Sequence, residues 1–100
     1  MIKKKSIIIN PKDNVATALV DLKAGDILEE EFSGEIKKIK LNHDIPFGHK
    51  MSLTEIAAGL PIIKYGEVIG TATELIHEGD YVHVHNVKSN RGRGDLEGGK

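Results

Sequence analysis

Two histidines near the end of the chain have the spacing of a pair of metal ligands. The stretch Tyr81–Val87 reads YVHVHNV, and its polar and apolar residues alternate as they do in a β-strand. Side chains two residues apart on a strand share a face and lie about 6–7 Å apart, so His83 and His85 could bind one metal ion. The same pair could also be the polar face of a strand. A third ligand would have to come from His43, His49, Asp44 or Asp13.

Two other short stretches place a cation beside a group that can exchange protons. His49 and Lys50 follow Gly48, where the imidazole could act as a general base and the ammonium could bind an anion. Lys64 and Tyr65 lie just before another glycine, where the lysine could neutralise a carboxylate and the phenol could donate or accept a proton. A polar turn with an exposed lysine would also account for either stretch.

Two further polar stretches are weaker candidates for ligand binding. Asp13 and Asn14 precede the apolar residues of Val15–Val20, a position where short polar side chains commonly form a turn. The RGRG run that begins at Arg91 could hold an anion, but it lacks the strand–loop–helix context of a phosphate-binding loop.

The composition limits the classes of function. The chain has 100 residues, enough for one small domain with a thin core. Its 14 basic and 15 acidic residues give a net charge of −1, without the basic excess typical of nucleic-acid binders. It has no cysteine, which excludes disulfides and zinc–thiolate sites. The apolar run Ile7–Ile9 is too short for a signal peptide or a membrane span, so we expect a cytoplasmic protein with no membrane or nucleic-acid partner.

Short strands separated by glycines must position these groups. Alternation of polar and apolar residues dominates, and long helical periodicity is weak. We therefore predict an all-β fold, with room for one or two short helical turns. Ile36, Ile39 and Lys40 would also suit a helix, but the segment around them is short, which favours a strand. The predicted strands are Lys5–Ile9, Val15–Val20, Glu35–Leu41, Pro61–Tyr65, Val68–Ile76 and Tyr81–Val87.

One turn pattern occurs three times, at residues 22–27 (LKAGDI), 56–62 (IAAGLPI) and 76–82 (IHEGDYV). Each begins with an apolar residue, followed by two spacers and a glycine, which supplies the positive φ that many tight turns need. The irregular spacing excludes a solenoid and indicates one kind of corner reused in a folded-over sheet, although three ordinary turns would look the same. We place the domain at residues 1–88 and a flexible C-terminal tail or linker at residues 89–100.

Four of these stretches, taken together and in this order, resemble the UxaA family. This family comprises the N-terminal domain, or separate small subunit, of altronate dehydratases and related sugar-acid dehydratases. The matching motifs are DNVA (13–16), GHK (48–50), KYG (64–66) and HVHN (83–86), and the resemblance runs from about Asn10 to Leu96. It implies a SAF domain with a β-clip fold, in which short strands fold over a thin core. It also implies a much larger dehydratase domain or subunit as the partner.

The resemblance implies a reaction and a set of roles. The reaction is β-elimination of water from an aldonate or aldarate such as altronate, within hexuronate catabolism. The cofactor is a divalent metal, Fe²⁺ or Mn²⁺, held mainly by the large subunit. The implied catalytic residues are His49, Lys50, Lys64 and Tyr65; the implied substrate-binding residues are Asp13, Asn14, Asn86 and Arg91; and the implied metal ligands are His83 and His85.

Two other functions fit the same residues. The small subunit of a sulfolactate sulfo-lyase, in the same family, would help to remove sulfite instead of water. A SAF module without catalysis would only bind a carbohydrate or an anion. Because 100 residues offer at most one wall of an active site, we expect little or no turnover by the chain alone. An exposed strand edge would also allow two copies of the chain to pair.

Overall fold

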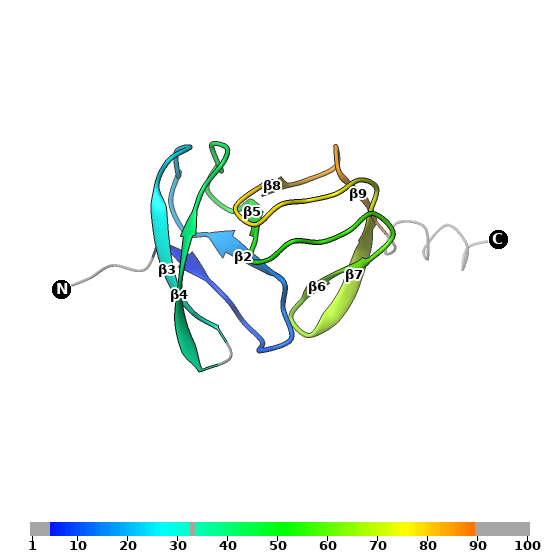
Figure 1. Ribbon diagram of the computed structural model, residues 1–100, viewed down its shortest axis with the longest axis horizontal. Helices are drawn as coiled ribbons and strands as arrows, with labels where there is room; N and C mark the ends of the chain where they lie inside the picture. Colours follow the sequence, from blue (N-terminus) through cyan, green and yellow to red (C-terminus); the bar gives the residue numbers. More distant parts are fainter. Residues whose placement is uncertain (1–4, 33, 90–100) are drawn as a thin grey trace.

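Short β-strands make up the protein (Figure 1). The computed structural model describes residues 5–32 and 34–89, and within these ranges it contains no helix, so the all-β prediction is confirmed. The strands are β1 (Ser6–Ile7), β2 (Val15–Ala18), β3 (Ile27–Phe32), β4 (Glu35–Lys40), β5 (Lys50–Ser52), β6 (Pro61–Lys64), β7 (Glu67–Ala72), β8 (Tyr81–Val82) and β9 (Val87–Ser89).

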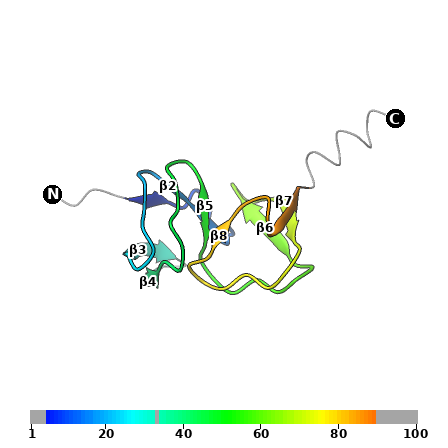
Figure 2. The same cartoon turned by 90° about the horizontal axis from the view of Figure 1, so that it is seen from above.

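These strands form antiparallel sheets that lie side by side. The central sheet has the order β1-β2-β5-β8, with the β3-β4 hairpin on one side and the sheet β6-β7-β9 on the other (Figure 1 and Figure 2). Strands far apart in sequence become neighbours, since β5 pairs with both β2 and β8. Such a folded-over arrangement of short strands is consistent with the expected β-clip.

Four corners in the described part of the chain turn it between the sheets, one more than the sequence predicts. In each corner, an apolar residue that forms an isolated bridge precedes two spacers and a glycine, and the residue after the glycine donates its N–H to the carbonyl three positions earlier. The unpredicted corner is IPFGHK (45–50), where Pro46 and Phe47 replace the small or polar spacers of the others. The corner glycines are Gly25, Gly48, Gly59 and Gly79, with φ of 94°, 84°, 89° and 88°.

Apolar side chains form two separate core clusters. β2 contributes to both because neighbouring side chains of a strand point to opposite faces: Val15 belongs to one cluster, and Ala16 and Ala18 belong to the other. The larger cluster also takes side chains from the β3-β4 hairpin, and the smaller takes Ile62 of β6 and Ala72 of β7. The thin core expected of a chain this size is thus divided into two clusters of unequal size.

The prediction of one strand over Tyr81–Val87 is wrong. The chain leaves β8, turns at residues 83–86 and enters β9, and these two strands belong to different sheets. Asn86 closes the turn, because its Oδ1 accepts the His83 N–H at 3.0 Å and its Nδ2 donates to the Tyr81 carbonyl at 2.8 Å. The alternation in this stretch therefore reflects a turn that carries histidines, and His83 and His85 do not share a pleated face.

Other strand predictions hold with changed limits. A strand at Glu35–Leu41 is confirmed as β4, whereas Val68–Ile76 is too long, since β7 ends before the chain enters the last corner. The sequence does not predict β3, because ILEEEF lacks alternation. This strand is instead paired with the basic β4, where Glu29 stands opposite Lys38 and the opposite charges favour the pairing.

Candidate functional site

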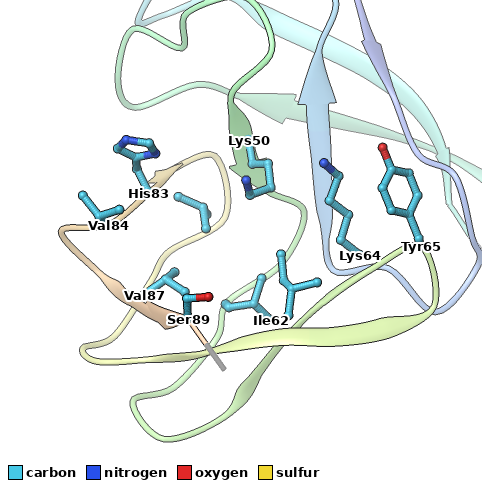
Figure 3. Close-up of a pocket in the computed structure, with 10 residues that line it drawn as sticks. Lys50, Ile62, Lys64, Tyr65, His83, Val84, Val87 and Ser89 are labelled. Atoms are coloured by element: carbon cyan, nitrogen blue, oxygen red, sulfur yellow. The ribbon is translucent and has the colours of Figure 1, made fainter. Parts of the chain in front are cut away.

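A pocket of about 310 Å³ opens beside the smaller core cluster (Figure 3). Strands β5, β6, β7, β8 and β9 each contribute to it, so its walls come from both the central sheet and the β6-β7-β9 sheet. Its lining is largely aliphatic, and none of its described lining residues is acidic. The lining residues are Lys50, Ile62, Lys64, Tyr65, Ile69, Val82, His83, Val84, Val87 and Ser89.

Two lysines give this pocket its charge. Lys50 is the first residue of β5 and Lys64 is the last residue of β6, and Figure 3 shows both side chains among the residues that line the pocket. Burial, together with the positive charge of Lys64, lowers the pKa of Lys50. Within the described part of the chain neither lysine forms a salt bridge. An anion in the pocket would therefore relieve the repulsion between two cations.

Tyr65 is held in an unusual backbone conformation at the mouth of the pocket. It forms, with Gly66, the two-residue turn between β6 and β7, and the two residues have φ of 58° and 75°. A positive φ at both positions is what a tight hairpin turn requires, but it is uncommon for a bulky residue. The conformation places the phenol beside Lys64, whose Nζ lies 4.7 Å from the ring centroid.

Asp13 and Asn14 hold this turn in place. Asp13 is only 2% exposed, and its two carboxylate oxygens accept the N–H of Gly66 at 2.8 Å and the N–H of Asn10 at 3.1 Å. The Asn14 side chain bonds the backbone of β6 twice, at 2.8 and 3.0 Å. These predicted substrate-binding groups are therefore engaged inside the fold, and neither lines the pocket.

Four rings form a cluster beside the pocket: His49, Tyr81, His83 and His85. The Tyr81 hydroxyl lies 2.6 Å from His49 Nδ1, and the Tyr81 ring stacks on His83 with centroids 5.4 Å apart and planes 8° from parallel. The His49 and His83 rings are 4.8 Å apart, and His85 is 5.6 Å from Tyr81. His83 also lines the pocket, so it connects the cluster to the lysines.

The environment of His83 favours its neutral form. Partial desolvation, and then the neighbouring His49, Lys50 and His85, lower the pKa of His83 below its usual range near 6.5. A neutral imidazole at the edge of the pocket can donate or accept a hydrogen bond without adding to the positive charge there.

Tyr81 is the member of the ring cluster that sequence reasoning did not select. The alternation of the stretch predicted that Tyr81, His83 and His85 share one face of a strand. The contact of Tyr81 with His49 instead joins β8 to the corner before β5, a strand that pairs with β8. No local sequence pattern predicts a contact between residues 32 positions apart.

The histidines and carboxylates considered as metal ligands are not arranged around one metal ion in the described part of the chain. His43 Nδ1 accepts the Tyr81 N–H at 3.2 Å, and Asp44 Oδ1 accepts the Ala24 N–H at 2.9 Å, each away from the pocket. Among the described residues, no group of three or more histidine, cysteine, aspartate or glutamate side chains is arranged to hold a metal ion. Within the described residues, His83 and His85 therefore lack a third donor of this kind, and their role as metal ligands stays a prediction.

The remaining predicted groups have other positions. Asn86 is 3% exposed and closes the turn that carries His83, so its amide is occupied by backbone partners. Arg91 and most of the predicted tail lie outside the described residues, while Ser89 is the last residue of β9. The fold therefore brings six of the predicted site residues to the pocket and its ring cluster: His49, Lys50, Lys64, Tyr65, His83 and His85.

The fold and the pocket define a small β-clip domain with two lysines in its pocket. Comparison with known proteins agrees: the family described as "Altronate/galactarate dehydratase SAF domain" matches residues 4–90. The chain belongs to this family. No helix in the described residues is long and apolar enough to cross a membrane.

The chain is similar to short parts of two long dehydratases and to half of a shorter sulfo-lyase subunit. It is 44% identical over 84 residues to an altronate dehydratase of Escherichia coli strain K12, which is 84% of this chain and 16% of that protein. It is 39% identical over 87 residues to an altronate dehydratase of Bacillus subtilis strain 168, which is 87% of this chain and 17% of that protein. It is also 45% identical over 47 residues to subunit alpha of the (2R)-sulfolactate sulfo-lyase of Chromohalobacter salexigens, which is 47% of this chain and 50% of that subunit.

Proposed function

We propose that this chain supplies one wall of the active site of a sugar-acid dehydratase, and that a larger domain or subunit supplies the rest. The observation that carries the proposal is the pair Lys50 and Lys64, which share an apolar pocket and have no acidic neighbour among its described lining residues. A carboxylate of an aldonate or aldarate would complement this pair. The similarity to altronate dehydratases over most of the chain supports the same substrate class.

The proposed roles follow from what β-elimination of water requires. A base must remove the proton next to the carboxylate, positive charge must stabilise the enediolate that forms, and an acid must protonate the departing hydroxyl. Lys50 and Lys64 would bind the carboxylate and stabilise the extra negative charge. Tyr65 and His83 lie at the same pocket and would form hydrogen bonds with the hydroxyl groups of the sugar acid.

A divalent metal, Fe²⁺ or Mn²⁺, is part of the proposal but not of this chain's described site. Such an ion would act as a Lewis acid on the enediolate. The described residues lack a group of three suitable donors, and the two lysines at the pocket would repel a cation. We therefore propose that the larger part of the enzyme supplies most of the metal ligands.

The size of the relatives supports a larger partner. The chain spans only 16% and 17% of the altronate dehydratases that it matches, so most of each of those proteins has no counterpart here. The pocket is also open, with Val84 at its rim 80% exposed. A second surface that covers this rim would exclude water from the lysines, and without it we expect little or no turnover.

A sulfo-lyase is the second candidate function. The matching relative is called subunit alpha, a separate small chain, and this chain covers half of its length. The same cationic wall would hold the carboxylate of sulfolactate. We favour the dehydratase because the similarity to altronate dehydratases covers 84% and 87% of the chain, against 47% for the sulfo-lyase subunit.

A chimeric enzyme tests the proposal. In the altronate dehydratase of Escherichia coli, the similar segment is replaced by residues 4–90 of this chain. We expect the chimera to dehydrate altronate, and we expect Lys64→Met to lower kcat/KM by about tenfold to a hundredfold, because a hydrogen bond to a charged group contributes about 1.5–3 kcal/mol. Sulfite release from sulfolactate is measured in parallel with a sulfo-lyase chimera.

The control is a lysine outside the pocket. Lys38 is an exposed residue of β4, in the hairpin on the other side of the central sheet, so Lys38→Met should leave kcat/KM within about twofold. A folded chimera that releases no product from either substrate would contradict catalysis and favour a binding module. Equal losses in the two lysine variants would contradict the role of the pocket.

A further inference from the structure

The hydroxyl of Tyr81 lies within hydrogen-bond distance of Nδ1 of His49. We propose that Tyr81 is a positioning residue that fixes the tautomer of His49, with the proton on Nε2, so that His49 offers a hydrogen-bond donor to the ligand. The nature of that ligand, a sugar acid, rests on the proposed function. The tautomer of the His49 imidazole does not depend on the proposed function, because contacts within this chain determine the tautomer.

The direction of the hydrogen bond decides the tautomer. Tyr81 Oη and His49 Nδ1 are 2.6 Å apart, a normal distance for an O–H donor with a good acceptor. A phenol ordinarily keeps its proton up to about pH 10, and a neutral imidazole has one nitrogen free to accept. If His49 donated instead, the phenolic hydrogen would have to turn toward solvent, because the described residues provide Tyr81 Oη with no second hydrogen-bond partner. That arrangement would also pair the weaker donor, an imidazole N–H, with the weaker acceptor, a phenol oxygen. Tyr81 is therefore the donor, and the neutral ring of His49 carries its proton on Nε2.

Contacts on several sides hold the tyrosine in this position. Its backbone N–H donates to His43 Nδ1 at 3.2 Å, and its carbonyl accepts Asn86 Nδ2 at 2.8 Å. Its ring stacks on His83, and its backbone pairs with Met51 of β5. A phenol held from the backbone and from one ring face has little freedom to turn away, so the hydrogen bond to His49 is preorganised.

The corner before β5 holds the imidazole from the other side. The His49 N–H donates to the Pro46 carbonyl at 3.0 Å, and the His49 carbonyl accepts the Ala18 N–H at 2.8 Å. The backbone of His49 is thus fixed on both sides, and its ring lies 4.8 Å from that of His83, at the edge of the lysine pocket. With Nδ1 occupied by Tyr81, Nε2 is the nitrogen that remains for a ligand.

An Nε2–H group suits a ligand that brings acceptors. Carboxylate and hydroxyl oxygens accept hydrogen bonds, and the neighbouring lysines attract the same negatively charged end of a molecule. The same tautomer has no lone pair on Nε2, so it cannot take a proton from carbon while the bond to Tyr81 is intact. His49 is consequently a donor to bound oxygen, and not the general base that its place beside Lys50 suggests.

Nuclear magnetic resonance of the full chain measures the tautomer directly. In ¹⁵N-labelled protein at about pH 8, above the ordinary titration of histidine, two-bond ¹H–¹⁵N spectra distinguish the protonated nitrogen of each imidazole from the bare one. We expect His49 to show a protonated Nε2 and a bare, hydrogen-bonded Nδ1. In Tyr81→Phe we expect the His49 nitrogen shifts to move toward a mixture of tautomers, while Tyr65→Phe leaves them unchanged. A protonated Nδ1 in the wild-type chain, or unchanged His49 shifts in Tyr81→Phe, would overturn the inference.

The chimeric dehydratase separates this inference from the proposed function. In an active chimera, Tyr81→Phe should lower kcat/KM by about tenfold, the amount expected when one hydrogen-bond donor is no longer held in place. An inactive chimera with the Nε2–H tautomer would count against the dehydratase and leave the role of Tyr81 standing. An active chimera in which His49 carries its proton on Nδ1 would support the dehydratase and overturn the role of Tyr81.

Discussion

Removal of the Asp13 carboxylate should destabilise the protein far more than removal of a carboxylate that caps a surface turn. Asp13 is 2% exposed and accepts two backbone N–H groups, from Gly66 and Asn10. Asp13→Ala leaves both donors without their partner, at about 1–3 kcal/mol for each unsatisfied group. We therefore expect the free energy of unfolding to fall by about 2–6 kcal/mol, a large share of the roughly 5–15 kcal/mol that holds a small domain folded.

Asp26 provides the matched control. Its Oδ2 accepts one backbone N–H, that of Lys23 at 3.0 Å, in an exposed corner. Asp26→Ala should cost only about 0.5–1.5 kcal/mol, the usual contribution of one hydrogen bond. Urea denaturation followed by circular dichroism gives both free energies of unfolding, and Asp13→Asn, which keeps one acceptor oxygen and the side-chain volume, should fall between them.

The position of the KYG turn gives a second readout of the same substitution. Because Asp13 accepts the Gly66 N–H, its loss should release the turn that carries Tyr65 at φ 58°. Amide hydrogen exchange at Gly66 should then speed up in Asp13→Ala under conditions where the rest of the domain stays folded. A destabilisation below about 1 kcal/mol in Asp13→Ala, together with unchanged exchange at Gly66, would refute the reasoning.

Two further predictions concern titration and backbone conformation. Because the pKa of His83 is lowered in the folded state, the unfolded chain binds the proton first, and stability should fall as the pH drops from about 7 through the folded pKa. His83→Gln should flatten this decline in urea denaturation curves recorded between pH 8 and 5, and identical curves would contradict the shift. A Cβ at Gly79 would lie 2.2 Å from a backbone carbonyl oxygen, whereas Gly25, with a similar φ, has open space around it. Gly79→Ala should therefore lower the melting temperature clearly more than Gly25→Ala, and equal losses would mean that the positive φ alone sets the cost.

Much of the fold could be predicted because its signals are local. Alternation and glycine spacing indicated short strands and corners, and three of the four described corners follow the predicted pattern. The corner at residues 45–50 was missed because its defining features are a backbone hydrogen bond and a positive φ at Gly48, and its Pro46 and Phe47 resemble none of the other spacers. β3 was missed because ILEEEF does not alternate, although its pairing with β4 sets Glu29 opposite Lys38 and Glu30 opposite Lys37.

The site was less predictable because its contacts join distant residues. The stretch at 81–87 has the alternation of a strand, yet Asn86 closes a turn there with three hydrogen bonds, and no spacing rule anticipates that. The contact between Tyr81 and His49 depends on the pairing of β8 with β5, which the sequence does not specify. The histidines could be identified as candidates from their residue type, but Tyr81, whose hydroxyl contacts His49, could not.

The motifs shared with the family combine residues that face the pocket with residues that hold its walls. In KYG, Lys64 lines the pocket while Gly66 bonds to Asp13 of the DNVA motif, so these two motifs are physically one unit although 53 positions separate the bonded residues. In HVHN, His83 lines the pocket while Asn86 closes its turn. We therefore expect Asp13 and Asn86 to affect a bound ligand only through the positions of other groups. Substitution of either should alter the shape of the pocket without changing the charge of its two lysines, whereas substitution of Lys64 should do the reverse.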